Sequence, residues 1–145
     1  MVEGSENPPD DDSIKDNDLL YRRIHWSQLV WDDNSRAWRV SSGDWDDPSG
    51  GDVSIYLGST LALHAVDPVG VLDGYPLDSL VFVTARQARG LRLGVIRDPD
   101  TEDKHPRSIA HGLLTGMLHG NAGRRAQRRP LAKFNVFVVV RPRAE

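Results

Sequence analysis

The sequence predicts one α+β domain with a mixed or mostly antiparallel sheet and short helices. Its 145 residues, of which 39% are hydrophobic, are enough for one compact domain. Runs rich in β-branched residues alternate with short stretches that begin and end with helix capping residues. These stretches are too short for the crossover helices of a doubly wound parallel sheet, so an antiparallel arrangement is expected.

Three strands are expected in the first part of the domain. Residues 19–24, 37–41 and 53–57 each combine β-branched or aromatic residues with alternating apolar positions. Polar turn residues at 32–35 and a polar loop at 42–51 separate them. Four tryptophans are spaced by five, seven and seven residues, which fits neither a strand nor one helix face, so we expect them to anchor irregular segments onto the core: Trp26, Trp31, Trp38 and Trp45.

Two short helices are expected in the middle of the chain. Ser59 and Thr60 are suitable caps for a helix over residues 61–66 that ends before Pro68. Thr84 should cap a second helix over residues 85–89, which Gly90 ends. Strands at 80–83 and 93–96 flank this second helix.

The last third contains the strongest strand signal. Residues 109–118 are apolar on both faces and contain two glycines, which favours an interior strand over a helix. Residues 121–133 predict a basic helix interrupted by Pro130. Residues 134–140 are rich in valine and phenylalanine and predict a final strand. Whether that strand is interior or an edge open to augmentation is left undecided by the sequence.

Charge is unevenly distributed along the chain. Residues 1–20 carry a net charge of −6, residues 21–103 carry −5, and residues 104–145 carry +8. Residues 1–17 are acidic and poor in large apolar side chains, so we expect a disordered acidic arm, followed by the single α+β domain over residues 18–145. The chain contains neither a signal-peptide pattern nor a long apolar run, so a cytoplasmic protein without membrane contact is expected.

The leading candidate contact residues lie in the basic helix: Arg124, Arg125, Arg128 and Arg129. A glycine-rich turn precedes them, and guanidinium groups near a helix start suit a phosphate group or an acidic partner. Spacing by four residues places Arg124 with Arg128, and Arg125 with Arg129, in two rows. The segment does not have the spacing of a P-loop.

No catalytic, cofactor-binding or metal-ligating residues are expected. The absence of cysteine excludes disulfides, thiolate-liganded zinc and a cysteine nucleophile. Five scattered histidines form no zinc-binding motif, and a buried, hydrogen-bonded His111 is the simplest interpretation of that residue. The acidic stretch that begins at Asp44 places proline and isoleucine where a calcium loop needs ligands.

Two resemblances to known groups of proteins add further expectations. The order of residues 21–24, Ser41 with Ser42, and Tyr56 resembles that in ADP-ribosyltransferase-like and RES-type folds, and the resemblance implies NAD use with a late glutamate, for which Glu102 is the candidate. The chain also resembles small bacterial proteins often found beside defence or conflict genes. This resemblance rests on the order of four segments: residues 94–99, the segment around His111, the arginine helix and the valine-rich end. That resemblance implies an accessory role.

The function expected from the sequence is therefore non-enzymatic. The first hypothesis is a cytoplasmic bacterial accessory protein that acts by protein–protein contact through residues 124–129. The second is a nucleic-acid-binding module that uses the same arginines. The third is a diverged NAD-using enzyme. The sequence does not indicate an oligomeric state.

Overall fold

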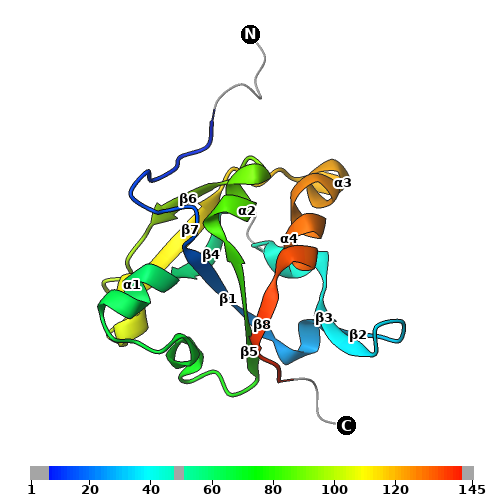
Figure 1. Ribbon diagram of the computed structural model, residues 1–145, viewed down its shortest axis with the longest axis horizontal. Coiled ribbons are helices and arrows are strands. Elements are labelled where there is room, and N and C mark those ends of the chain that lie inside the picture. The colour runs from blue at the N-terminus through cyan, green and yellow to red at the C-terminus, as the bar shows by residue number, and fades with distance from the viewer. Residues whose placement is uncertain (1–6, 48–50, 142–145) are drawn as a thin grey trace.

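A six-stranded antiparallel sheet forms the centre of the protein (Figure 1). The computed structural model describes residues 7–47 and 51–141. The strand order is β6-β7-β4-β1-β5-β8, and every pairing among the described residues is antiparallel. The α+β class predicted from the sequence is confirmed.

The strands lie close to where the sequence places them. The large sheet contains β1 (Leu19–His25), β4 (Val53–Leu57), β5 (Asp78–Thr84), β6 (Gly94–Arg97), β7 (His111–Thr115) and β8 (Val136–Val139). A separate hairpin contains β2 (Leu29–Asp32) and β3 (Ala37–Val40). β2 was not predicted; it is paired so that Trp31 lies opposite Trp38, with ring centres 5.5 Å apart.

The helical segments are short. They are η2 (Trp26–Gln28), η3 (Ser42–Trp45), α1 (Gly58–Leu63), η4 (Pro68–Leu72), α2 (Ala85–Gly90), η5 (Pro106–Ala110), α3 (Gly120–Gly123), η6 (Arg124–Arg128) and α4 (Arg129–Phe134). Thr84 caps α2 as predicted: its hydroxyl accepts from the Gln87 N–H, and the Gln87 side chain accepts from the Thr84 N–H.

Two helices differ from prediction for identifiable reasons. Helix α1 begins at Gly58, because the buried Asp18 carboxylate accepts from both the N–H and the hydroxyl of Ser59. Pro130 does not interrupt the basic helix, because it falls in the first turn of α4, where a missing N–H costs little. The preceding η6 is a π-turn, in which the Arg129 N–H donates to the Arg124 carbonyl.

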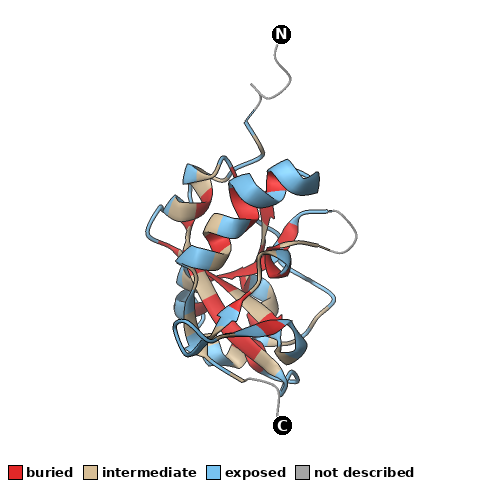
Figure 2. Cartoon of the chain, turned by 90° about the vertical axis from the view of Figure 1, so that its right-hand side faces the viewer, coloured by how far each residue is buried: buried red, intermediate tan, exposed pale blue. Residues whose placement is uncertain are grey.

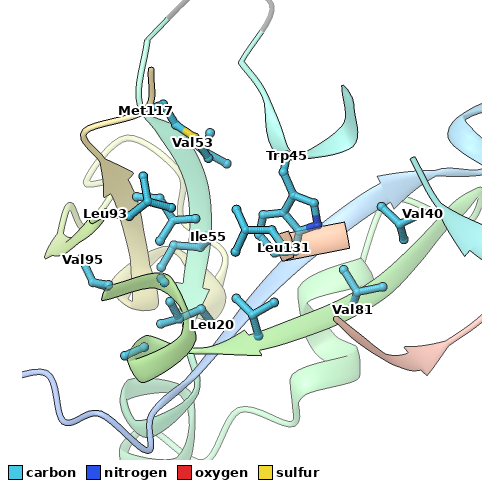
Figure 3. Close-up of a cluster of buried hydrophobic side chains, with 14 of the residues drawn as sticks. Leu20, Val40, Trp45, Val53, Ile55, Val81, Leu93, Val95, Met117 and Leu131 are labelled. Atoms are coloured by element: carbon cyan, nitrogen blue, oxygen red, sulfur yellow. The ribbon is translucent and has the colours of Figure 1, made fainter. Parts of the chain in front are cut away.

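The sheet separates two hydrophobic cores. On one face, α2, η3 and α4 cover a core centred on Trp45, which is fully buried beside Leu131 (Figure 3). On the other face, α1, η4 and η5 cover a smaller core around Tyr21, Tyr56 and Leu61. The helices direct buried residues towards the sheet and exposed residues outward (Figure 2).

The N-terminal segment differs from the expected disordered arm. Residues 1–6 lie outside the described part, but Ile14 is only 1% exposed and belongs to the main core. The Asp11 N–H donates to the Val95 carbonyl, and the Asp10 carboxylate accepts from the Val95 N–H. Arg89 lies within 3.2 Å of carboxylate oxygens of Asp10 and Asp16. The acidic residues therefore attach this segment along β6, at one edge of the sheet.

The other edge of the sheet is β8, which answers the question left undecided by the sequence. β8 pairs with β5, and no described strand pairs with its second side. The register shifts between Leu80 and Val81, which adds local twist at this edge.

Candidate functional site

The structure separates the four candidate arginines. Arg124, Arg125 and Arg129 are exposed, whereas Arg128 is 1% exposed. The Arg128 Nη2 lies 3.0 Å from an Asp46 carboxylate oxygen, so this guanidinium faces η3 instead of solvent. Unlike the other three predicted contact residues, Arg128 is therefore turned inward by the helix and does not lie on the outer surface of this structure. Three arginines remain on the outer surface.

An apolar surface lies directly after the basic helix. α4 leads through Asn135 into β8, and alternate side chains of this segment face solvent. We name these side chains the β8 edge surface: Phe134, Val136, Val138 and Val140, which are 41%, 50%, 40% and 44% exposed. Edge strands of natural proteins usually carry charges or prolines that block further pairing, and β8 itself carries neither.

Charge of one sign surrounds the β8 edge surface in the sequence. No acidic residue occurs between Lys104 and Arg141. Lys133 precedes β8 by three residues and is exposed, and Arg141 follows it by two. An open strand and exposed cations therefore occur together in residues 124–141, whereas the sequence pattern pointed only to the arginines.

A buried polar cluster positions the turn against which Arg128 packs. The Arg22 guanidinium donates to the carbonyl oxygens of Asp44, Ser54 and Asp46. Burial lowers the pKa of Arg22 to about 10, while the nearby Asp44, Asp47 and Asp46 carboxylates oppose that shift. Arg22 also lies 5.8 Å from the Trp45 ring centre, so it connects β1 to η3.

Asp44 should make the stability of the protein depend on pH. Burial raises the pKa of Asp44 to about 6 from an ordinary value of 3.8, despite the hydrogen bond from the Ser41 N–H and the nearby Arg22. The folded state then binds more protons than the unfolded state between these values, so this group's contribution to stability falls as pH rises from about 4 to about 6, by on the order of 2 kcal/mol.

Chemical denaturation of Asp44→Asn at several pH values tests this expectation. The amide oxygen can still accept from Ser41, so the stability of the variant relative to the unaltered protein should increase as pH rises through this window. Asp32→Asn is the matched control: hydrogen bonds from the Asn34 and Ser35 N–H groups lower the pKa of Asp32 below its ordinary value of 3.8, so its relative stability should change little in this window and should decrease with rising pH only below it. If the difference in the free energy of unfolding between Asp44→Asn and the unaltered protein did not change with pH, the expectation would be contradicted.

The residues of the NAD-related resemblance do not form one site. Tyr21 and Tyr56 belong to the smaller core, and the ring centre of Tyr56 lies 6.0 Å from the guanidinium carbon of Arg23. Arg22 instead points to the opposite face, where it meets the turn that begins at Ser41. Glu102 is exposed in the segment between β6 and η5.

A shallow cavity of about 510 Å³ lies at the start of β1, beside α1. Asp18, Ser59 and Lys15 supply polar groups, and Leu19 and Tyr21 form part of the apolar wall. Burial, together with the Asp18 and Asp67 carboxylates, raises the pKa of Tyr21, so its phenol stays protonated. Both Asp18 oxygens already accept hydrogen bonds, one from the N–H and the other from the hydroxyl of Ser59, so this carboxylate is occupied at the start of α1.

Two of the histidines have polar partners of their own. His111 is half-buried, with Nδ1 2.8 Å from the Asp98 carbonyl oxygen, and His105 Nε2 lies 2.9 Å from an Asp73 carboxylate oxygen. In residues 7–47 and 51–141, no three histidine, aspartate or glutamate side chains are close enough to hold a metal ion.

Comparisons with known proteins add no family assignment. The chain matches no protein-family model, no curated protein and no solved structure. Within the described part of the chain, none of the helices has the length and apolar character needed to cross a membrane.

Proposed function

We propose that this domain is a non-enzymatic protein-binding module that takes an extended segment of an acidic partner along β8. The observation that carries the proposal is a difference between the two edges of the large sheet: one edge is hydrogen-bonded to the N-terminal segment and the other is unpaired. Residues 10–11 cover β6 with hydrogen bonds to both backbone groups of Val95, whereas no described strand pairs with the outer side of β8. Added strands gain affinity from backbone hydrogen bonds at such an open edge.

The side chains support an apolar strand as the occupant. Val136 and Val138 are 50% and 40% exposed on an otherwise uncharged strand, so alternate apolar residues of a partner strand would bury them. This contact combines hydrogen-bonding specificity with removal of apolar surface from water.

The charges favour an acidic partner over a second copy of this chain. Arg125, Arg129 and Lys133 are exposed ahead of β8, and Arg141 follows it. Antiparallel pairing with a second copy would bring Lys133 of one chain near Arg141 of the other, which like charges disfavour. Acidic residues flanking a partner strand would instead meet cations at both ends.

Fluorescence anisotropy with labelled synthetic peptides tests the proposal. The probe is a nine-residue peptide of alternating valine and threonine with aspartate at both ends, and its matched form has lysine at the ends. Val138→Glu should weaken binding of the acidic peptide by about tenfold or more, because it places a like charge on the strand. Val30→Glu, at an exposed valine of the β2–β3 hairpin, is the matched control and should change binding less than about twofold.

Equal binding of the acidic and lysine peptides, or equal effects of Val138→Glu and Val30→Glu, would reject the proposal. A labelled DNA duplex in the same assay tests the second hypothesis. Arg124, Arg125 and Arg129 remain exposed and could contact phosphates. Duplex binding that weakens steeply with salt and disappears when all three are replaced by alanine would favour a nucleic-acid module.

We propose in addition that this module serves as an accessory protein of the bacterial cytoplasm. Such a protein needs no catalytic group of its own, and recruitment of a partner segment is sufficient for that role.

A further inference from the structure

Arg23 has an unusual environment for a partly buried arginine. Its guanidinium carbon lies 3.6 Å from the centre of the Tyr75 ring and 6.0 Å from that of Tyr56. Its Nη1 is fully buried and has no hydrogen-bond partner in the structure. No carboxylate of the described residues lies within 4.0 Å of this guanidinium, although the chain contains 21 acidic residues.

The other arginines that are partly or fully buried have polar partners for their guanidinium groups. Arg22 donates to three carbonyl oxygens, Arg89 and Arg128 meet carboxylates, and Arg141 donates to the Tyr75 carbonyl. Among the described residues, Arg23 is thus the half-buried arginine whose guanidinium lies against aromatic rings and has neither an ion pair nor a partner for its Nη1. Desolvated N–H groups without acceptors cost free energy, so such a group calls for a partner.

A second guanidinium lies beside the same ring. The Arg107 guanidinium carbon is 5.1 Å from the Tyr75 ring centre, and its Nε is also buried without a hydrogen-bond partner. Arg107 Nη1 donates to the Asp73 carbonyl oxygen, and Nε lies 3.6 Å from an Asp103 carboxylate oxygen. Arg107 is therefore held in place by the protein, whereas Arg23 retains its full set of donors.

From this arrangement we infer that Arg23 binds an oxyanion, the phosphate or carboxylate group of a small ligand, at the surface beside Tyr75. When a guanidinium stacks on a ring, its N–H groups still point outward in the guanidinium plane. A phosphate or carboxylate at the edge of that plane can accept hydrogen bonds from two of them. Arg23 is half-buried and Tyr75 is 38% exposed, so the anion approaches from solvent towards the guanidinium N–H groups other than the buried Nη1. The Arg107 guanidinium carbon lies 5.1 Å from the same ring centre, with its charge partly balanced by Asp103.

This inference does not rest on the proposed function, although Arg141, which follows β8, donates to the Tyr75 carbonyl oxygen. Arg23 lies on β1, in the interior of the sheet, and its cross-strand partner on β5 is Leu80. The β8 edge surface can therefore bind a peptide whether or not Arg23 binds an anion, and the two experiments can fail separately.

Side-chain NMR of protein labelled with ¹⁵N-arginine tests the inference at the site itself. The probes are sodium phosphate and sodium acetate, each titrated at constant ionic strength set with sodium chloride. The Arg23 Nε–Hε resonance should shift along a saturable curve with a dissociation constant of about 1 mM or tighter. Saturation with phosphate alone identifies a phosphate ligand, and saturation with acetate as well identifies the broader oxyanion class.

Two variants complete the experiment. Arg23→Lys retains the charge but loses the planar fork, and it assigns the resonance by removing it. Ligand-induced shifts at the neighbouring Arg107 should weaken about tenfold in this variant. Arg86→Lys, at an exposed arginine of α2, is the matched control and should leave the Arg23 titration unchanged. Two results in the unaltered protein would overturn the inference. One is an Arg23 chemical-shift change that rises linearly with anion concentration without saturating, and the other is an Arg23 change no larger than that of Arg86.

Discussion

Replacement of Arg128 by alanine is expected to lower the free energy of unfolding by about 3 kcal/mol. The side chain is 1% exposed and packs between its helix and η3, so truncation removes both its packing and its ion pair with Asp46. Urea denaturation followed by tryptophan fluorescence measures the loss. The emission is suited to this purpose because Trp45, next to Asp46, is fully buried in the folded protein.

Two further variants identify the origin of that loss. Arg124→Ala removes an exposed arginine of the same segment and should change stability by less than about 0.5 kcal/mol. Arg128→Met retains most of the volume without the charge, and a packed apolar residue can replace a buried ion pair at little cost. We therefore expect Arg128→Met to be more stable than Arg128→Ala. Equal, small effects of Arg128→Ala and Arg124→Ala would show that Arg128 is exposed in solution.

Ile14→Ala is expected to lower the free energy of unfolding by about 2 to 4 kcal/mol. Ile14 is 1% exposed and lies in the main core, although its neighbours in the sequence are polar. Truncation leaves a cavity where the N-terminal segment meets the body of the domain. Thermal or urea unfolding of the purified variant measures the change.

Lys15→Ala is the matched control for Ile14, because Lys15 is the exposed next residue. It should change stability by less than about 0.5 kcal/mol. A disordered arm would make Ile14→Ala equally neutral, so this comparison decides between the docked segment in the structure and the arm expected from composition.

Local patterns accounted for most of the secondary structure. β4 spans the predicted residues 53–57, because alternation of apolar side chains is a property of the strand itself. Helix α2 has the predicted cap because Thr84 and Gln87 are three residues apart and satisfy each other's backbone groups. The β2 strand was not predicted because its pairing with β3 places Trp31 opposite Trp38, and no local sequence pattern indicates that cross-strand contact.

The candidate site was only partly predictable. Composition located the basic segment, and Arg124, Arg125 and Arg129 are exposed there. Helical spacing could not show that Arg128 points inward, because Asp46, its partner, is 82 positions away in the chain. The stack of Arg23 on Tyr75 likewise joins β1 to a distant loop, and its only sequence signal was the pair of adjacent arginines at 22 and 23.

Local sequence patterns were enough to predict the α+β class, the positions of the main strands, the Thr84 cap and the concentration of positive charge after residue 103. Each of these follows from side-chain periodicity, local hydrogen bonding or composition, which act over a few residues. Tertiary structure decided which acidic residues attach the N-terminal segment, which arginine is buried, and that β6 is covered while β8 is open. These outcomes depend on contacts between residues far apart in the chain, and their free energy is gained only when the whole sheet assembles.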